Sequence, residues 1–231
     1  LVPIDGGYKY LLSKRLGLHR LRGFGIVIAN LCFFTALVTV PLAEAVAIFF
    51  IVPLLITLLS VFLLGEQVGI KSWVAVFGGL LGLLIMVRPG FGVFNPASML
   101  PLAAALIHSL VQITTRKMGK GEKASTMVFY IQLNLVFFSS LMGLIFGDGK
   151  FSDPSQPIIF YLFRSWIVPT WQDLMIMFGI GIFSGLGAYF ISQAYRITKA
   201  GILAPFEYVA CLLYTSDAAD DSLRVDLGGP R

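Results

Sequence analysis

The chain has 231 residues, of which 57% are hydrophobic and 13% charged, and its mean hydropathy is +0.86. These values exclude an ordinary water-soluble domain, and two cysteines exclude a framework of disulfides or a metal-spaced cysteine cluster. The net charge of +5 needs no nucleic-acid partner, because apolar segments separate the basic residues instead of one folded face gathering them.

Six apolar runs predict membrane-spanning helices, since a hydrocarbon core about 30 Å thick needs about 20 helical residues. The clearest run ends at Gly65 and contains a single charge, Glu44. A further span begins at Ile202. The stretch 147–171 is polar with three prolines, so we expect a loop that lies partly in the membrane interface. The predicted spans are 24–40, 42–64, 73–87, 97–115, 126–146 and 174–195.

The distribution of Lys and Arg predicts the orientation of these spans. Alternate loops lie on the same side of the membrane. The loops of one side contain 12 basic residues, and those of the other side contain three, Arg88, Lys150 and Arg164. Cytoplasmic loops retain Lys and Arg during insertion, so we expect the loops with 12 to face the cytoplasm. The sequence therefore predicts an integral, multi-pass protein of a bacterial inner membrane.

Both ends of the chain depart from this pattern. The first residue is Leu1, with no signal peptide after it, and we expect an upstream portion to be missing. From Cys211 the sequence CLLYTSDAADDSLRVDLGGPR leaves the apolar pattern in the middle of a predicted span. It resembles a translated sequencing-library adaptor, and the alternative is a short soluble tail.

The segment PLAEAVAIFFIVPLLITLLSVFLLGE, from Pro41 to Glu66, and the following Trp73-led helix that ends in MVRPG resemble an EamA-type transporter of the drug/metabolite superfamily. The resemblance implies an all-α polytopic fold of ten helices in two inverted five-helix repeats. Here it implies a fragment with about six complete transmembrane helices. An odd number of spans per repeat inverts the second repeat, which suits a transporter that binds its solute between the halves.

The resemblance also implies the division of the chain. We expect residues 1–23 to be a remnant of helix two and a basic cytoplasmic loop, and 24–90 to be helices three to five, the end of the first repeat. Residues 91–210 would then be helices six to nine of an incomplete second repeat. The segment 211–231 is the expected adaptor-derived tail.

Polar side chains within the spans are the first candidates for a solute pathway, because each is costly in lipid unless it faces protein or water. His108 and Gln112 are four residues apart and share a helical face. They line a cavity or bond a neighbouring helix, and the sequence leaves both open. Gln132 and Asn134 are two apart, so at most one points inward. Ser192 belongs to a stripe of small residues that extends to the end of its span.

Three carboxylates have different expected roles. Glu207 would lie about six residues into the last span, and we expect it in a cavity with Tyr195 and Tyr208 nearby. Glu44 lies in the first turn of its helix, where it is a gate residue or a solvated helix-end charge. Glu66 follows Gly65 on the cytoplasmic side, and we expect a helix-end or gate residue there.

Two pairs of glycines have the spacing of close helix contacts. Gly78 with Gly82, and Gly181 with Gly185, are four residues apart in predicted spans and would let backbones approach. No strand precedes either pair, so neither predicts a phosphate-binding loop. We expect these glycines to pack helices.

The sequence therefore predicts a secondary transporter, without cofactor or metal, that moves a small organic metabolite by alternating access. The solute would be an amino acid or a nucleoside-like or S-adenosylmethionine-like compound, since the APFEY run resembles S-adenosylmethionine permeases. Proton coupling is expected if Glu207 or His108 titrates. The alternatives are a structural membrane subunit and an intramembrane enzyme, although no HExxH or GxSG-type motif supports the enzyme.

Overall fold

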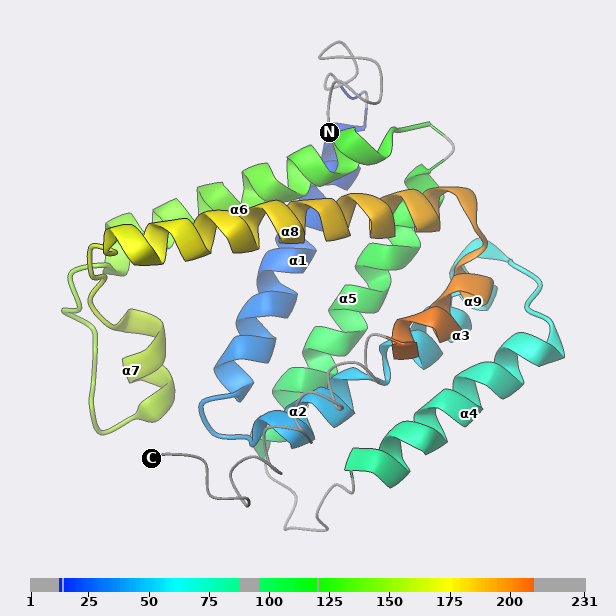
Figure 1. Cartoon of the computed structure of the whole chain (residues 1–231), viewed down its shortest axis with the longest axis horizontal. Coiled ribbons are helices and arrows are strands. Elements are labelled where there is room, and N and C mark those ends of the chain that lie inside the picture. The colour runs from blue at the N-terminus through cyan, green and yellow to red at the C-terminus, as the bar shows by residue number, and fades with distance from the viewer. Residues whose placement is uncertain (1–12, 14, 88–95, 120, 210–231) are drawn as a thin grey trace.

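The computed structural model describes residues 13, 15–87, 96–119 and 121–209, and within these ranges all regular structure is helical. The elements in chain order are α1 (Leu16–Ala36), α2 (Leu42–Phe49), α3 (Val52–Leu64), α4 (Ile70–Val87), η2 (Pro96–Ser98), α5 (Met99–Met118), α6 (Ala124–Phe146), α7 (Pro157–Phe163), α8 (Trp171–Ile197), α9 (Ala200–Leu203) and η3 (Ala204–Phe206) (Figure 1).

The helices confirm an all-α, polytopic membrane protein. Four described stretches are long and apolar enough to cross a membrane, Leu42–Leu64, Pro96–Met118, Ala124–Phe146 and Trp171–Ile197. Helices α1 and α4 occupy the other two predicted spans. Large apolar side chains of α6 and α8 are exposed, for example Leu144 at 84%, Phe178 at 69% and Phe183 at 76%. Such exposure suits a surface that contacts lipid or further helices.

The second predicted span is divided in two. The sequence predicts one helix over 42–64, but α2 ends at Phe49 and α3 begins at Val52. Pro53 lies in the first turn of α3, and a proline has no N–H and its ring collides with the carbonyl four residues earlier. That carbonyl belongs to Phe49, so a continuous helix cannot pass this point.

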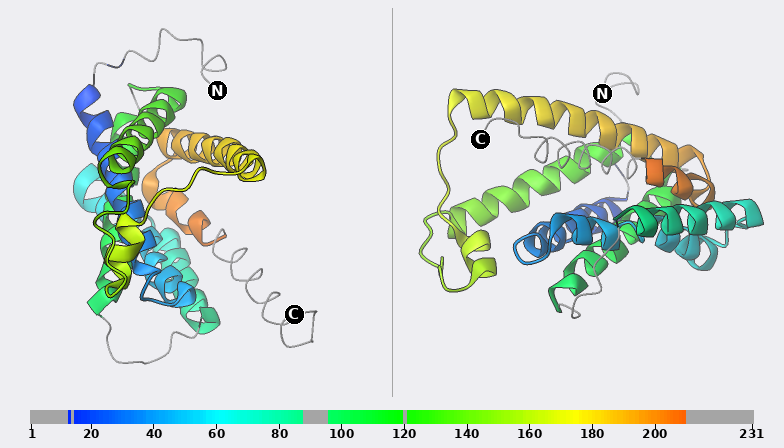
Figure 2. Two further views of the ribbon diagram at one scale, coloured as in Figure 1. Left: turned by 90° about the vertical axis from the view of Figure 1, so that its left-hand side faces the viewer. Right: turned by 60° about the horizontal axis from the view of Figure 1, so that its bottom comes forward.

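The helices gather at one end of the molecule. The ends of α3, α5, α6 and α8 that adjoin the basic loops come together at the upper right of Figure 1, whereas their other ends are spread toward the left and lower edges. We call this gathered region the basic end. Helix α1 packs on α5 and α6, and α8 lies antiparallel to α6 (Figures 1 and 2). The basic end is therefore the region where these helices contact one another.

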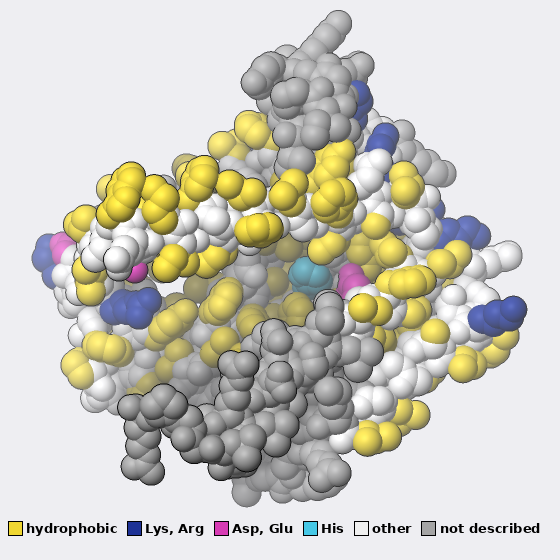
Figure 3. Space-filling view, viewed as in Figure 1, with side chains coloured by type: hydrophobic (Ala, Val, Ile, Leu, Met, Phe, Trp, Pro, Cys, Tyr) yellow, Lys and Arg dark blue, Asp and Glu magenta, His cyan; other side chains and the backbone are white. Residues whose placement is uncertain are grey.

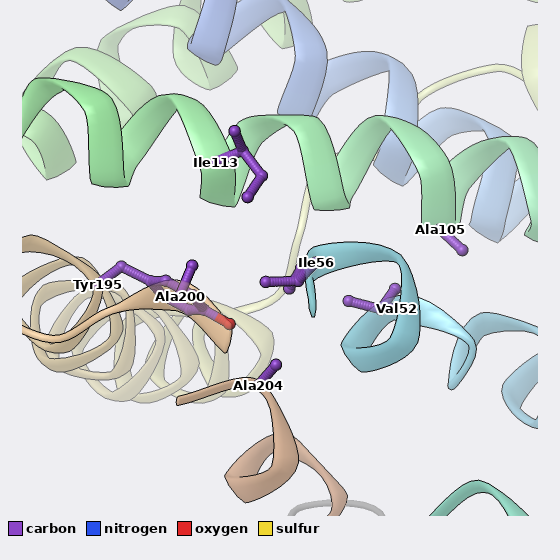
Figure 4. Close-up of a cluster of buried hydrophobic side chains, with 7 residues drawn as sticks. All are labelled: Val52, Ile56, Ala105, Ile113, Tyr195, Ala200 and Ala204. Atoms are coloured by element: carbon purple, nitrogen blue, oxygen red, sulfur yellow. The ribbon is translucent and has the colours of Figure 1, made fainter. Parts of the chain in front are cut away.

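A small hydrophobic core joins the early helices to the late ones. Figure 4 shows it as seven buried side chains from α3, α5, α8, α9 and η3. Small residues on α9 and η3 let these short helices lie against α3, and Tyr195 at 1% exposure fills the space beside them. The members are Val52, Ile56, Ala105, Ile113, Tyr195, Ala200 and Ala204.

The predicted division of the chain stays a prediction. Helix α1 begins at Leu16, eight residues before the predicted span, and α9 begins at Ala200, two residues before the predicted start. Helix α7 lies within the stretch 147–171, where the sequence predicts a loop. Residues 1–12, the repeat boundary at 90 and the tail 211–231 lie outside the described residues.

Candidate functional site

The predicted neighbours Tyr195 and Glu207 contact each other. Tyr195 lies near the end of α8, and its hydroxyl donates a hydrogen bond of 2.6 Å to Oε1 of Glu207. Glu207 follows η3 directly, so the short link between α8 and α9 folds the two residues together. A hydrogen bond this short is typical of an O–H donor on an ionised acceptor. The phenol therefore fixes the position of a partly buried carboxylate.

His108 and Gln112 form a second polar pair, on α5. The Gln112 amide nitrogen lies 3.2 Å from Nε2 of His108, and since an amide nitrogen donates, the ring nitrogen accepts. The ring of Phe49, the last residue of α2, meets the His108 ring edge-on at 5.6 Å between centroids. The pair therefore lies beside the break between α2 and α3, and the side chain of His108 remains partly accessible.

One face of the molecule has a hollow that contains titratable side chains. In Figure 3 a histidine and an acidic side chain are visible in a hollow between α8 and the helices below it. Tyr208 and Ser192 are buried, at 6% and 4% exposure. The ring of Tyr208 packs on Gly79 of α4, where an added Cβ would lie 2.4 Å from a ring atom. Tyr195 belongs to the hydrophobic core and Phe49 packs against it, so both polar pairs adjoin that core, and we call them, with Phe49 and Tyr208, the polar and aromatic cluster.

The polar residues of α6 divide as their spacing predicts. Asn134 packs against Gly23 of α1, where a Cβ would lie 2.4 Å from its side chain, and its amide donates to the Tyr130 carbonyl. Gln132 is two positions away and points to another side of α6. Its role as a solute ligand stays a prediction.

The glycines that approach other helices are not the predicted ones. Within the described residues, nothing lies within 4 Å of a Cβ built at Gly78, Gly82, Gly181 or Gly185. Their packing role stays a prediction. Close contacts occur instead at Gly79 and, on α9, at Gly201, where a Cβ would lie 2.5 Å from the side chain of Val68.

Glu44 and Glu66 lie at opposite ends of the divided span. Glu44 is in the first turn of α2, and Oε1 accepts a hydrogen bond of 3.1 Å from the hydroxyl of Ser98, at the start of α5. A first-turn carboxylate is also stabilised by the helix dipole. This contact ties the starts of α2 and α5 together.

Glu66 is the centre of a hydrogen-bond network at the basic end. Gly65 ends α3 in the left-handed conformation, at φ +63°, which glycine adopts without strain. The turn brings Glu66 to Arg116 of α5, whose Nε donates to Oε1 at 2.8 Å. Its Oε2 accepts from the backbone N–H of Ala200, also at 2.8 Å. One carboxylate thus joins α3, α5 and α9.

Two arginines extend this network beyond what the sequence analysis anticipated. Nη1 of Arg116 donates to the carbonyl of Arg196 at 3.1 Å, and Nε of Arg196 donates to the carbonyl of Gly119 at 3.2 Å. The sequence feature that could have predicted these contacts is a basic residue in the last turn of a helix, because its side chain can reach the last backbone carbonyls. Both arginines lie in such a turn, of α5 and of α8.

The described residues contain no group of three His, Cys, Asp or Glu side chains that could hold a metal ion. The cluster offers hydrogen-bonding and aromatic groups instead. Such a set can orient an organic solute with polar atoms on a flat ring, since a few placed polar groups in an apolar site give orientation and specificity.

Comparison with known proteins places the fold among transporters. Residues 16–88 match the EamA-like transporter family. The chain is 29% identical to a riboflavin transporter of Vibrio cholerae over 200 residues, 86% of this chain and 61% of that protein. It is 24% identical to an S-adenosylmethionine uptake transporter of Rickettsia prowazekii over 207 residues, 90% of this chain and 64% of that protein.

A solved crystal structure with 22% identity has the same fold, with a TM-score of 0.69 over 94% of this chain and 73% of the other. The chain spans somewhat more than three fifths of the length of the two transporters it resembles. The family match over residues 16–88 and these relatives support an EamA-type transporter of the drug/metabolite superfamily.

Proposed function

We propose that the protein is a secondary transporter that moves a small organic metabolite across a bacterial inner membrane by alternating access. The observation that carries the proposal is the hydrogen-bonded Tyr195–Glu207 pair, together with the polar pair of His108 and Gln112 on α5. Polar groups are costly at membrane depth and mark solute pathways. The network of Glu66 joins α3, α5 and α9 at the basic end, and such a contact suits a transporter state that is closed on that side.

The solute we propose is a heteroaromatic metabolite. The two relatives are named for riboflavin and S-adenosylmethionine, compounds that both contain a fused, nitrogen-rich ring system. The cluster offers matching groups: the rings of Phe49 and Tyr208 for stacking, and the amide of Gln112 and the carboxylate of Glu207 for ring nitrogens and amino groups. Ser192 and Gln132 remain proposed ligands.

Glu207 is also the proposed site of proton coupling. It is partly buried, and its hydrogen bond comes from a phenol instead of a cation. A carboxylate that exchanges its proton with one side in each state would link solute movement to the proton gradient. His108 is the second group that could carry this proton. The proposed orientation places the basic end in the cytoplasm.

The test measures uptake into proteoliposomes by the purified protein. Labelled riboflavin and S-adenosylmethionine are supplied with and without a pH gradient. We expect saturable uptake of one solute, and Glu207→Gln should remove the effect of the gradient while some exchange remains. Ser139→Ala, an exposed change on α6, is the matched control. No uptake of any heteroaromatic solute by folded protein would favour a structural subunit and overturn the proposal.

A further inference from the structure

A pocket of about 490 Å³ lies at the basic end, between the end of α3, the end of α5 and the start of α9. Its charged lining residues are Glu66, Arg116, Lys117 and Lys199. The volume is in the range of small-molecule sites. Neither Tyr195 nor Glu207 is among its lining residues.

The charges of this pocket do not balance. The carboxylate of Glu66 is already engaged, by Arg116 at 2.8 Å and by a backbone N–H at 2.8 Å. The ion pairs found in the described part of the chain include no partner for Lys117 or Lys199. Two positive charges therefore remain in a concave site that contains one neutralised pair.

The position of the pocket selects the ligand chemistry. It lies where α3 and α5 end, which is the depth of the lipid headgroups if these helices cross the membrane. Basic pockets between transmembrane helices on the cytoplasmic side bind anionic headgroups. An arginine fork matches phosphate oxygens in two-point hydrogen bonds, and lysines add point charge. The side chain of Arg116 is 17% exposed and so can be reached by such a group.

We propose that this pocket binds a phosphate group, with Lys117 and Lys199 as its charge partners and Arg116 as a shared one. The phosphate competes with Glu66 for the guanidinium, so its binding loosens the contact between α3 and α5. The group comes from the headgroup of an anionic lipid or from soluble phosphate, and the chemistry is the same. The assignment does not depend on the identity of the transported solute.

The experiment titrates the purified chain in detergent and follows its thermal unfolding. The probes are a short-chain phosphatidylglycerol, phosphatidylcholine of equal chain length, and inorganic phosphate against chloride at constant ionic strength. The pocket variant is Lys117→Gln with Lys199→Gln. The control variant is Arg20→Gln with Lys71→Gln, which removes the same charge from exposed positions outside the pocket.

We expect phosphatidylglycerol to stabilise the chain more than phosphatidylcholine, with an affinity that falls by about tenfold or more in the pocket variant and little in the control. Stabilisation by phosphatidylglycerol alone identifies a lipid headgroup, and stabilisation by inorganic phosphate as well identifies a site open to soluble phosphate. Glu66→Gln should bind the same probe more tightly, because it removes the competitor for Arg116. Equal responses of the pocket and control variants, or weaker binding in Glu66→Gln, would overturn the proposal.

Discussion

Replacing Tyr195 by Phe and Glu207 by Gln, singly and together, measures the free energy of the contact that fixes the carboxylate. Tyr195 is 1% exposed, and the phenylalanine ring keeps its packing while the hydroxyl is lost. Because the amide oxygen of glutamine can still accept from the phenol, the double-mutant cycle measures the part of the 2.6 Å hydrogen bond that depends on the carboxylate charge.

The expected coupling energy depends on the charge of Glu207. A hydrogen bond to an ionised group contributes about 1.5–3 kcal/mol, whereas interhelical hydrogen bonds in a bilayer average about 0.6 kcal/mol. For the ionised carboxylate we therefore expect a coupling energy of about 2 kcal/mol. At a pH low enough to protonate the carboxylate, the coupling should fall, because the stronger charge-assisted bond is then lost.

The assay is reversible unfolding of the purified chain in mixed micelles with increasing dodecyl sulfate, followed by far-ultraviolet circular dichroism. Tyr161→Phe on α7 is the matched control, because that tyrosine contributes its ring to Arg164, at 5.4 Å, and phenylalanine keeps a ring there. We expect the control to change the free energy of unfolding by less than about 0.5 kcal/mol. A coupling energy for the Tyr195–Glu207 pair within about 0.5 kcal/mol of zero would refute the reasoning.

Two further changes test contacts between helices in the same unfolding assay. Gly79→Ala places a methyl group 2.4 Å from the ring of Tyr208, and we expect a loss of about 1–3 kcal/mol from overpacking. Gly78→Ala, in open space one residue away, should gain up to about 1 kcal/mol from helix propensity, and a similar effect of both changes would contradict the α4 contact. Glu66→Gln removes the charge that Arg116 meets at 2.8 Å, and we expect a loss of about 1–3 kcal/mol, most of it absent when Arg116→Gln is already present. Additive losses for these two residues would show that their contact contributes nothing.

Contacts within one helix, or across one short link, could be predicted from the sequence. His108 and Gln112 are four residues apart on a helix, and that spacing alone brings their side chains together. Tyr195 and Glu207 are twelve apart, at the end of one apolar run and just inside the next, so a short link joins them. The apolar runs themselves indicate the positions of the six spans, because bilayer thickness sets their length.

Contacts between distant segments could not be predicted in this way. Glu66 and Ala200 are 134 residues apart, and only the packed bundle brings the carboxylate to that N–H. The spacing of Gly78 and Gly82 predicts a helix face that another helix can approach closely. In the described structure Tyr208 packs instead against the adjacent Gly79. The division of the second span had a local signal in Pro53, which the continuous apolar run obscured.

The break between α2 and α3 makes a backbone carbonyl available for contact with a solute. With proline at position 53, the carbonyl oxygen of Phe49 has no amide donor four residues ahead. Main-chain acceptors of this kind persist at membrane depth only where protein or water satisfies them, and broken helices of transporters use them to hold cargo. Alanine scanning would leave this oxygen in place. Replacing the proline restores a backbone N–H at position 53, which could then donate to the carbonyl oxygen of Phe49 and occupy it.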